Sequence, residues 1–155
     1  MRVLAFDPGE TTGWALVDSE TENRTFLSGE FPAFSWAAKL VNGYEPDVAV
    51  VEAFRLYPSR AKAQSWSTFP AVEVIGVIKF VCQKANVPIV FQNASLAKSI
   101  WVDCDQGAIN KHAYDALRHA LIWLRRNGNG DNFSDIIRFT RSKKGKGTSA
   151  SNKRT

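Results

Sequence analysis

The chain has 155 residues, of which 45% are hydrophobic and 23% are charged. This length and composition are those of a soluble globular domain, and they exclude a collagen, a coiled coil and a chain that is disordered throughout. No apolar run approaches the ~18 residues that a membrane-spanning helix requires. The N-terminus also lacks the basic and apolar segments of a signal peptide, so we expect a cytoplasmic protein with no membrane partner.

The net charge of +5 is unevenly distributed. Residues 1–137 carry a net charge of −2, whereas residues 138–155 carry +7. After Thr140 the sequence is rich in Gly, Ser and Lys and has no large apolar side chain, so burial cannot offset the entropy of ordering it. We therefore expect a folded domain at 1–139 and a basic, disordered tail at 140–155. The tail either binds a polyanion or only aids solubility.

Apolar runs separated by polar turns predict three strands at the N-terminal end, arranged as an antiparallel meander. Further along the chain, two buried strands alternate with helices, and the last helix carries one apolar stripe at helical spacing. This alternation predicts a mixed α/β sheet with helices on its faces. The expected strands are 1–6, 12–18, 24–30, 48–51 and 89–91, and the expected helices are 34–41, 59–85 with a kink or break at Pro70, 95–101 and 109–126.

Three acids occupy unusual positions: Asp7 follows the first strand, Glu52 follows the fourth, and Asp115 lies beside the apolar stripe of the last helix. Carboxylates at the ends of buried strands are unfavourable unless they are neutralised. If the first and fourth strands are neighbours, the three acids converge on a site suited to Mg²⁺ or Mn²⁺. Two such ions activate water and stabilise the leaving oxygen of a phosphodiester. The alternative is three separate surface carboxylates with local caps or ion pairs.

Two histidines accompany Asp115 on the last helix. His112 and His119 lie three residues before and four residues after it, so all three side chains share one helix face. His112 is either a metal ligand or a base. His119 is either the partner of a carboxylate or a packed residue of the helix face.

Three segments of the sequence occur in a characteristic order: DPGETTGWAL after the first strand, VVEAF at the end of a central strand, and HAYDALRHAL on the last helix. Together they resemble a RuvC-type Holliday junction resolvase. The short length and the abbreviated late region are similar to the phage-encoded members, and the resemblance covers about residues 1–126. It implies an RNase H-like mixed sheet, with three antiparallel strands followed by parallel strands and helices on both faces.

The resemblance also implies an activity. It is that of an Mg-dependent endodeoxyribonuclease, a crossover junction endonuclease that resolves Holliday junctions and other branched DNA by paired symmetric nicks. The implied metal ligands are Asp7, Glu52, Asp115 and His112, holding two Mg²⁺ ions for which Mn²⁺ substitutes. The implied partners are a four-way DNA junction and a second copy of the chain, with no small-molecule substrate. For a phage-encoded protein the implied location is the host cytoplasm.

Aromatic and basic residues around these segments suit DNA. In the resemblance, an aromatic side chain just after Glu52 holds the junction open by stacking on a base, and Phe54 and Tyr57 follow that acid. The alternative is that these side chains pack on the dimer partner. Candidate phosphate contacts, which position a duplex without reading its sequence, are Arg55, Arg60, Lys62, Lys98 and Lys111.

Two other functions fit parts of the sequence. The pattern D-x-G-x-T-x-G also occurs in sugar kinases and actin-like ATPases, which need a second lobe for which this chain has no room. A non-catalytic junction-binding protein is the other alternative. The three acids argue against it, because they repel phosphate unless a cation is bound.

Overall fold

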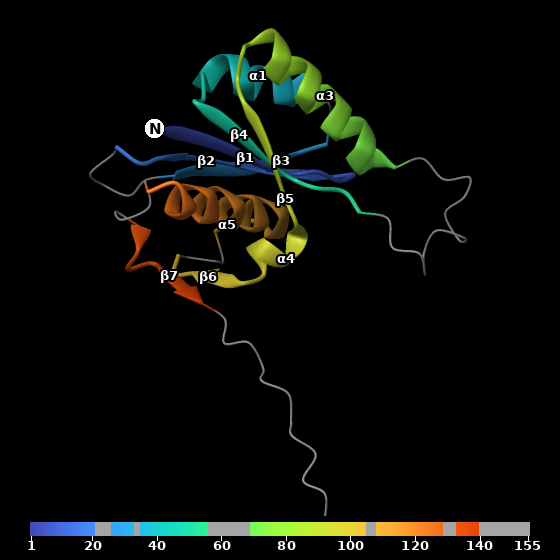
Figure 1. Ribbon diagram of the computed structural model, residues 1–155. Coiled ribbons are helices and arrows are strands. Elements are labelled where there is room, and N and C mark those ends of the chain that lie inside the picture. Colours follow the sequence, from blue (N-terminus) through green and yellow to red (C-terminus); the bar gives the residue numbers. More distant parts are fainter. Residues whose placement is uncertain (21–25, 33–34, 56–68, 105–107, 129–132, 140–155) are drawn as a thin grey trace, which may run out of the picture.

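The computed structural model of the chain describes residues 1–20, 26–32, 35–55, 69–104, 108–128 and 133–139 (Figure 1). The predicted tail at 140–155 lies outside these ranges, as does the first part of the helix predicted at 59–85. Across the described ranges, no helix is both long and apolar enough to cross a membrane.

The central sheet has the strand order β3-β2-β1-β4-β5. β1 (Arg2–Asp7), β2 (Thr12–Asp18) and β3 (Phe26–Phe31) form the antiparallel meander that the sequence predicts. β4 (Val48–Glu52) pairs in parallel with β1, and β5 (Ile89–Gln92) pairs in parallel with β4. The carboxyl ends of β1, β4 and β5 therefore meet at one edge of the sheet.

Helices cover both faces of this sheet. α1 (Ser35–Tyr44) and α3 (Pro70–Lys84) lie on one face, and α5 (Lys111–Arg126) lies on the other (Figure 1). The mixed sheet with helices on both faces confirms the predicted fold class. The predicted apolar stripe of the last helix is also confirmed, because all six of its members are buried: Ala113, Ala116, Leu117, Ala120, Leu121 and Leu124.

The pleat of the strands divides the apolar core into two layers. In β1, Val3 and Ala5 belong to the core under α5, whereas Leu4 and Phe6 belong to the core under α1 and α3. The residues of β4 from Val48 to Val51 are at most 4% exposed, which confirms that this strand is buried on both faces. Burial of a large apolar side chain contributes about 1.5–3 kcal/mol, so the two layers hold the sheet edge in place.

The prediction of a helix over 95–101 is wrong. α4 (Ala94–Ala97) is a single turn, and β6 (Ile100–Val102) follows it and pairs antiparallel with β7 (Ile137–Phe139), which the sequence analysis missed. The strand is favoured because Ile100 and Val102 are buried on one side and Trp101 is exposed on the other. This period of two extends over only three residues, which is too short to distinguish a strand from a helix by pattern.

One smaller prediction, on β5, also needs correction. β5 was expected to be buried, but it is the edge strand of the sheet and its Phe91 is 40% exposed. Pro70, which was expected to mark a kink or a break, begins α3, where a missing N–H is not needed. Residues 59–68 of that predicted helix lie outside the described residues.

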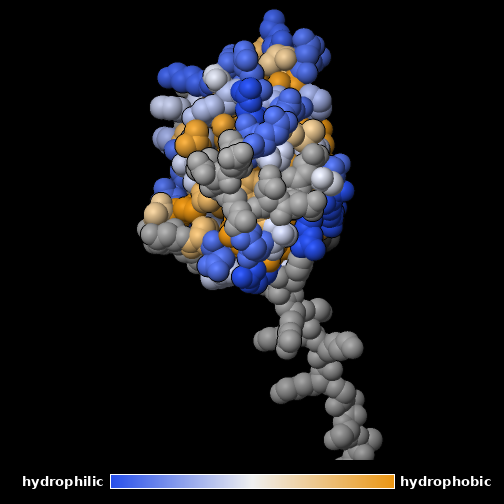
Figure 2. Space-filling view, turned by 90° about the vertical axis from the view of Figure 1, so that its left-hand side faces the viewer, coloured by the Kyte–Doolittle hydropathy of each residue, from blue (hydrophilic) through white to orange (hydrophobic). Residues whose placement is uncertain are grey.

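The end of the sheet from which the N-terminus emerges carries mostly hydrophilic side chains. Hydrophobic side chains form only small separate groups on the face of the molecule that Figure 2 shows. The opposite end, where the parallel strands finish, is where the acids lie.

Candidate active site

Polar side chains end three neighbouring strands at the carboxyl edge of the sheet. Phe6 of β1 pairs with Val51 of β4, so Asp7 and Glu52 follow paired residues, and Glu52 in turn pairs with Gln92 of β5. Each lies two residues beyond a side chain of the core under α5, so the pleat turns all three toward that helix. Asp7 and Glu52 are thus neighbours, as expected for adjacent first and fourth strands.

The first turn of α5 lies directly on β2. A Cβ atom on Gly13 would lie 2.0 Å from the carbonyl carbon of His112, so only glycine leaves room for the helix backbone. Asn110 at the N-cap position makes no side-chain capping bond. Instead, the His112 backbone N–H donates to Glu30 Oε1 of β3 at 3.2 Å. These two contacts hold the start of α5 over the carboxyl edge of the sheet.

One helix supplies a partner for each of the three acids. His112 Nδ1 donates to Asp7 Oδ2 at 2.9 Å, and His119 Nε2 donates to Glu52 Oε2 at 2.9 Å. Arg118 Nη1 donates to Asp115 Oδ1 at 2.7 Å, within α5 itself. These three hydrogen-bonded contacts are partly shielded from water, so they compensate much of the cost of gathering acids at one edge.

His119 is the most deeply buried of these groups, with no exposed surface. While Nε2 bonds to Glu52, Nδ1 is hydrogen-bonded to the side-chain amide of Gln92 at 2.8 Å. Because both ring nitrogens have partners, the imidazole is fixed in its plane, and it fixes one oxygen of Glu52. His119 is therefore a packed helix-face residue and a carboxylate partner at once.

The pKa of the Asp7 carboxyl is raised by its burial and by the neighbouring acids. Burial raises the pKa of the Asp7 carboxyl above its ordinary value, whereas the hydrogen bond from His112 lowers it. The charges of Glu52 and Asp115 raise the pKa of Asp7 further. The charges of the other two acids thus make an ionised Asp7 less favourable, which favours either a proton or a cation at this edge.

The donor set fits a hard divalent cation, although it is not assembled around one point. In the described part of the chain, no group of three or more His, Cys, Asp and Glu side chains is arranged to hold an ion. Within those same ranges, each of the three carboxylates uses only one oxygen in its helix contact, which leaves the second oxygen for a cation. Carboxylate oxygens are the ligands that Mg²⁺ prefers.

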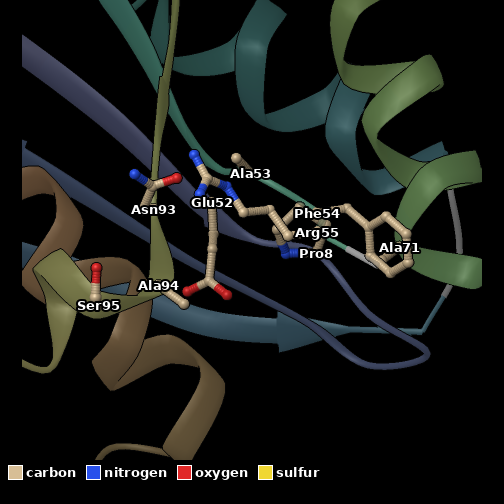
Figure 3. A pocket seen from close by; sticks show the side chains of 9 residues that line it. All are labelled: Pro8, Glu52, Ala53, Phe54, Arg55, Ala71, Asn93, Ala94 and Ser95. Carbon is tan, nitrogen blue, oxygen red and sulfur yellow. The ribbon is translucent and has the colours of Figure 1, made fainter. Parts of the chain in front are cut away.

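A pocket of about 220 Å³ opens beside Glu52. Figure 3 shows the Glu52 carboxylate turned into this pocket and the Arg55 side chain reaching across it. Phe54 stands at its margin, 41% exposed, with its ring centroid 5.3 Å from that of Phe69. An opening that combines an acid, a cation and an aromatic ring suits a phosphodiester strand and its base. The remaining lining residues are Pro8, Ala53, Ala71, Asn93, Ala94 and Ser95.

Of the other predicted DNA contacts, the structure describes two lysines. Lys98 ends α4 and Lys111 begins α5, and both are exposed but outside the pocket. Tyr57, Arg60 and Lys62 lie outside the described residues.

Sequence reasoning missed three residues that contact the acids or their helix: Glu30, Gln92 and Arg118. Two of them carried a usable signal. Gln92 follows a predicted strand as Glu52 does, and Arg118 lies one helical turn after Asp115. The role of Glu30 depends on β3 lying beside β2, which only the folded chain reveals.

No family model matches the sequence, and no curated protein matches it either. Solved structures do match. RuvC of Thermus thermophilus in complex with a Holliday junction substrate is 14% identical, with a TM-score of 0.63 over 83% of this chain and 97% of that chain. The fowlpox virus resolvase with its Holliday junction DNA is 13% identical, with a TM-score of 0.56 over 82% of this chain and 99% of that chain. The chain therefore has the fold of the RuvC and fowlpox virus Holliday junction resolvases, which confirms the resemblance to RuvC at the level of the fold. The similarity to phage-encoded members stays a prediction.

Proposed function

We propose that this protein is a structure-specific endodeoxyribonuclease that resolves Holliday junctions and cuts other branched DNA. The observation that carries the proposal is the convergence of Asp7, Glu52 and Asp115 at the carboxyl edge of a resolvase-like sheet. Acids gathered beside a DNA-binding surface would repel phosphate, so their accumulation favours a cation-dependent reaction on a phosphodiester. The pocket beside Glu52 offers a place for that phosphodiester.

The proposed metal ligands are Asp7, Glu52, Asp115 and His112. Two Mg²⁺ ions, or Mn²⁺ in their place, would activate the attacking water and stabilise the leaving oxygen. The chain itself contributes orientation. His119 and Gln92 hold the Glu52 carboxylate, so that ligand does not have to be ordered when the substrate binds.

His112 has a second candidate role. Its side chain is 43% exposed, and its Nδ1 bonds to Asp7, so the ring bridges a buried acid and the solvent-accessible edge. In this position it either ligates a metal ion or accepts a proton from the attacking water.

The proposed DNA contacts divide into stacking and charge. Phe54 lies at the margin of the pocket, where it can stack on a base beside the scissile phosphate. Arg55 reaches across the pocket and is suited to a phosphate oxygen (Figure 3). Additional phosphate contacts are proposed for Lys98 and Lys111, and further stacking or phosphate contacts for Tyr57, Arg60 and Lys62.

Paired symmetric nicks require two active sites, and each chain carries one set of the acids. A two-fold symmetric homodimer would present two identical sites to the two-fold symmetric junction. The homodimer is accordingly part of the proposal.

The alternatives receive less support. A nucleotide-binding domain of the actin or sugar-kinase kind closes two lobes around its ligand, whereas the resolvase structures match this chain over 97–99% of their own length. A non-catalytic junction-binding protein would have no use for an Asp7 carboxylate that burial and the charges of Glu52 and Asp115 make unfavourable.

The test compares a labelled four-way junction with a linear duplex of matching sequence, each incubated with the protein in Mg²⁺ and in chelator. We expect paired nicks in the junction alone, and only with Mg²⁺. Tight junction binding without nicks would indicate the alternative function, a non-catalytic junction-binding protein. Failure both to bind and to cut the junction would overturn the proposal.

A further inference from the structure

A second exposed aromatic side chain lies outside the pocket, on the small sheet formed by β6 and β7. Trp101 is 49% exposed, while its neighbours Ile100 and Val102 are buried. The alternation of the strand therefore forces the indole outward. Figure 1 shows this small sheet on the same side of the central sheet as α5.

The surroundings of Trp101 hold it rigidly. The ring of Tyr114 from α5 meets the indole edge to face, with centroids 6.2 Å apart and planes at 70°. Tyr114 Oη accepts a hydrogen bond from the Val102 N–H at 2.9 Å and donates to the Val102 carbonyl at 3.3 Å. Arg118 Nε donates to the Ile100 carbonyl at 3.0 Å. Both residues that flank Trp101 are thus tied to α5, so little entropy remains to be lost when a ligand covers the indole.

Contacts connect this tryptophan to the proposed site. The guanidinium of Arg118 lies over the Tyr114 ring, 5.3 Å from its centroid, and also bonds to Asp115. Trp101, Tyr114, Arg118 and Asp115 therefore form a continuous row of contacts. A nucleic acid strand leaving the proposed active site along this row would reach the indole.

The described charges around Trp101 are mixed. Arg138 of β7 is exposed and stands directly opposite Trp101 in the antiparallel pair. The exposed acid Asp103 follows β6 and offsets that charge. The sequence after β7, residues 140–155, contains six Lys and Arg residues and no acid. Because the charges of Arg138 and Asp103 largely offset one another, the affinity of this surface for a nucleic acid strand has to come mainly from stacking on the Trp101 indole, with a smaller contribution from the cations.

Trp36 is a second half-exposed tryptophan with described contacts, but it differs from Trp101 in what lies over its ring and in its position relative to α5. Trp36 of α1 is 46% exposed, but the ammonium of Lys39 lies 4.6 Å from its ring centroid, over its face. It also lies on the opposite face of the sheet from α5 (Figure 1). Trp36 is therefore a matched control for an exposed indole that has no route to the site.

We propose that Trp101 is a stacking platform for an unpaired nucleobase of the bound DNA, with Arg138 contacting an adjacent phosphate. This inference rests on the proposed function, because it assumes that DNA occupies the carboxylate edge. An unpaired base is the expected occupant, since branch points and their opened arms expose base faces that a duplex hides.

The test measures equilibrium binding in chelator, so that no strand is cut. The DNA ligands are the four-way junction and a single-stranded oligonucleotide. The proteins are the unmodified chain, Trp101→Ala, Trp101→Phe, Arg138→Ala and Trp36→Ala. We expect Trp101→Ala to weaken binding of both ligands by about 5- to 150-fold. Trp101→Phe should keep most of the affinity, and Trp36→Ala should bind as the unmodified chain does. Arg138→Ala should reduce the salt dependence of DNA binding by the amount that corresponds to the loss of about one phosphate contact.

A crosslinking measurement covers the case in which Trp101→Ala folds poorly. Single-stranded DNA carrying 5-iodouracil is irradiated with the unmodified chain, and the crosslinked peptide is sequenced; we expect the peptide that contains Trp101. Equal affinities of Trp101→Ala and Trp36→Ala, or crosslinked peptides that do not include the one with Trp101, would overturn the proposed stacking on Trp101 and favour a protein partner at this surface.

The outcomes for the platform and for the nuclease are separable. Junction cleavage by the unmodified chain, together with an unchanged DNA affinity of Trp101→Ala, would overturn the proposed stacking on Trp101 and leave the nuclease function standing. Single-strand binding that depends on Trp101, without any junction binding or cleavage, would support base stacking on Trp101 but overturn the proposed nuclease function. Absence of all DNA binding would overturn both.

Discussion

The contact between β2 and α5 yields the sharpest prediction, through the substitution Gly13→Ala. The added Cβ would lie 2.0 Å from the His112 carbonyl carbon, 2.1 Å from its oxygen and 2.4 Å from the Ala113 nitrogen. All three atoms are backbone, so no side chain can rotate away. Ordinary contact begins at 3.4 Å, which means that the first turn of α5 has to move by about 1.4 Å.

Such a movement affects both stability and activity. Overpacking of this kind costs typically 1–3 kcal/mol, which lowers the thermal midpoint of a domain of this size by about 2–12 °C. The same shift separates His112 Nδ1 from Asp7 Oδ2, now 2.9 Å apart. Misplacement by about 1 Å costs roughly 100-fold in rate, so we expect kcat for junction cleavage to fall by about two orders of magnitude.

The assay combines thermal unfolding by circular dichroism with single-turnover junction cleavage well below the unfolding midpoint. Gly76→Ala is the matched control, because a Cβ at Gly76 in α3 meets nothing within 4 Å. That substitution should raise stability by about 0.4–1 kcal/mol and leave cleavage unchanged. If Gly13→Ala cuts at the normal rate with an unchanged midpoint, then α5 does not position the site through this contact.

Further predictions concern the acids, their partners and the tail. Asp7→Asn, Glu52→Gln and Asp115→Asn should each abolish cleavage while junction binding survives or tightens; full nicking by any one variant would remove that residue from the site. Because burial raises the pKa of Asp7 above 3.8, the folded protein binds a proton that the unfolded chain lacks between 3.8 and the raised value. Stability in chelator should therefore fall as pH rises through that window. Asp7→Asn should flatten this dependence and unfold at a higher temperature than the unmodified chain at neutral pH, as circular dichroism would reveal. His119→Ala should lower kcat about 10- to 100-fold with little change in KM, because Glu52 loses its orientation; an equal rise in KM would indicate a role in binding instead. Deletion of residues 142–155 should weaken junction binding and reduce its salt dependence, and an identical salt slope would show that the tail makes no phosphate contact.

Much of the sheet was predictable because its signals are local. β2 was predicted with the bounds Thr12–Asp18 that the structure has, since polar turns mark both of its ends. The apolar stripe of α5 repeats from Ala113 to Leu124, over about three turns, so its helical period is unambiguous. Asp7 and Glu52 stood out because a carboxylate directly after a buried strand is unusual in any fold.

The pairings between distant segments could not be read in the same way. β6 and β7 are three residues each, and Val102 pairs with Ile137 far along the chain. Neither segment carries enough residues for a period, so only the partner stabilises each as a strand. β5 was mistaken for a buried strand because apolar composition alone does not reveal which strand lies at the edge.

The candidate site likewise has a part that local sequence patterns predict and a part that depends on contacts between distant segments. The sequence by itself singled out the acids and histidines that are proposed to carry the chemistry, because each of them has a position that local strand and helix patterns define. Only the tertiary structure decided their partners: His119 between Glu52 and Gln92, Arg118 on Asp115, and Glu30 at the start of α5. Hydrogen bonds of this kind depend on distances of about 3 Å between side chains from different elements. Strand order, helix placement and the missing Cβ of Gly13 set those distances, and no local pattern contains them.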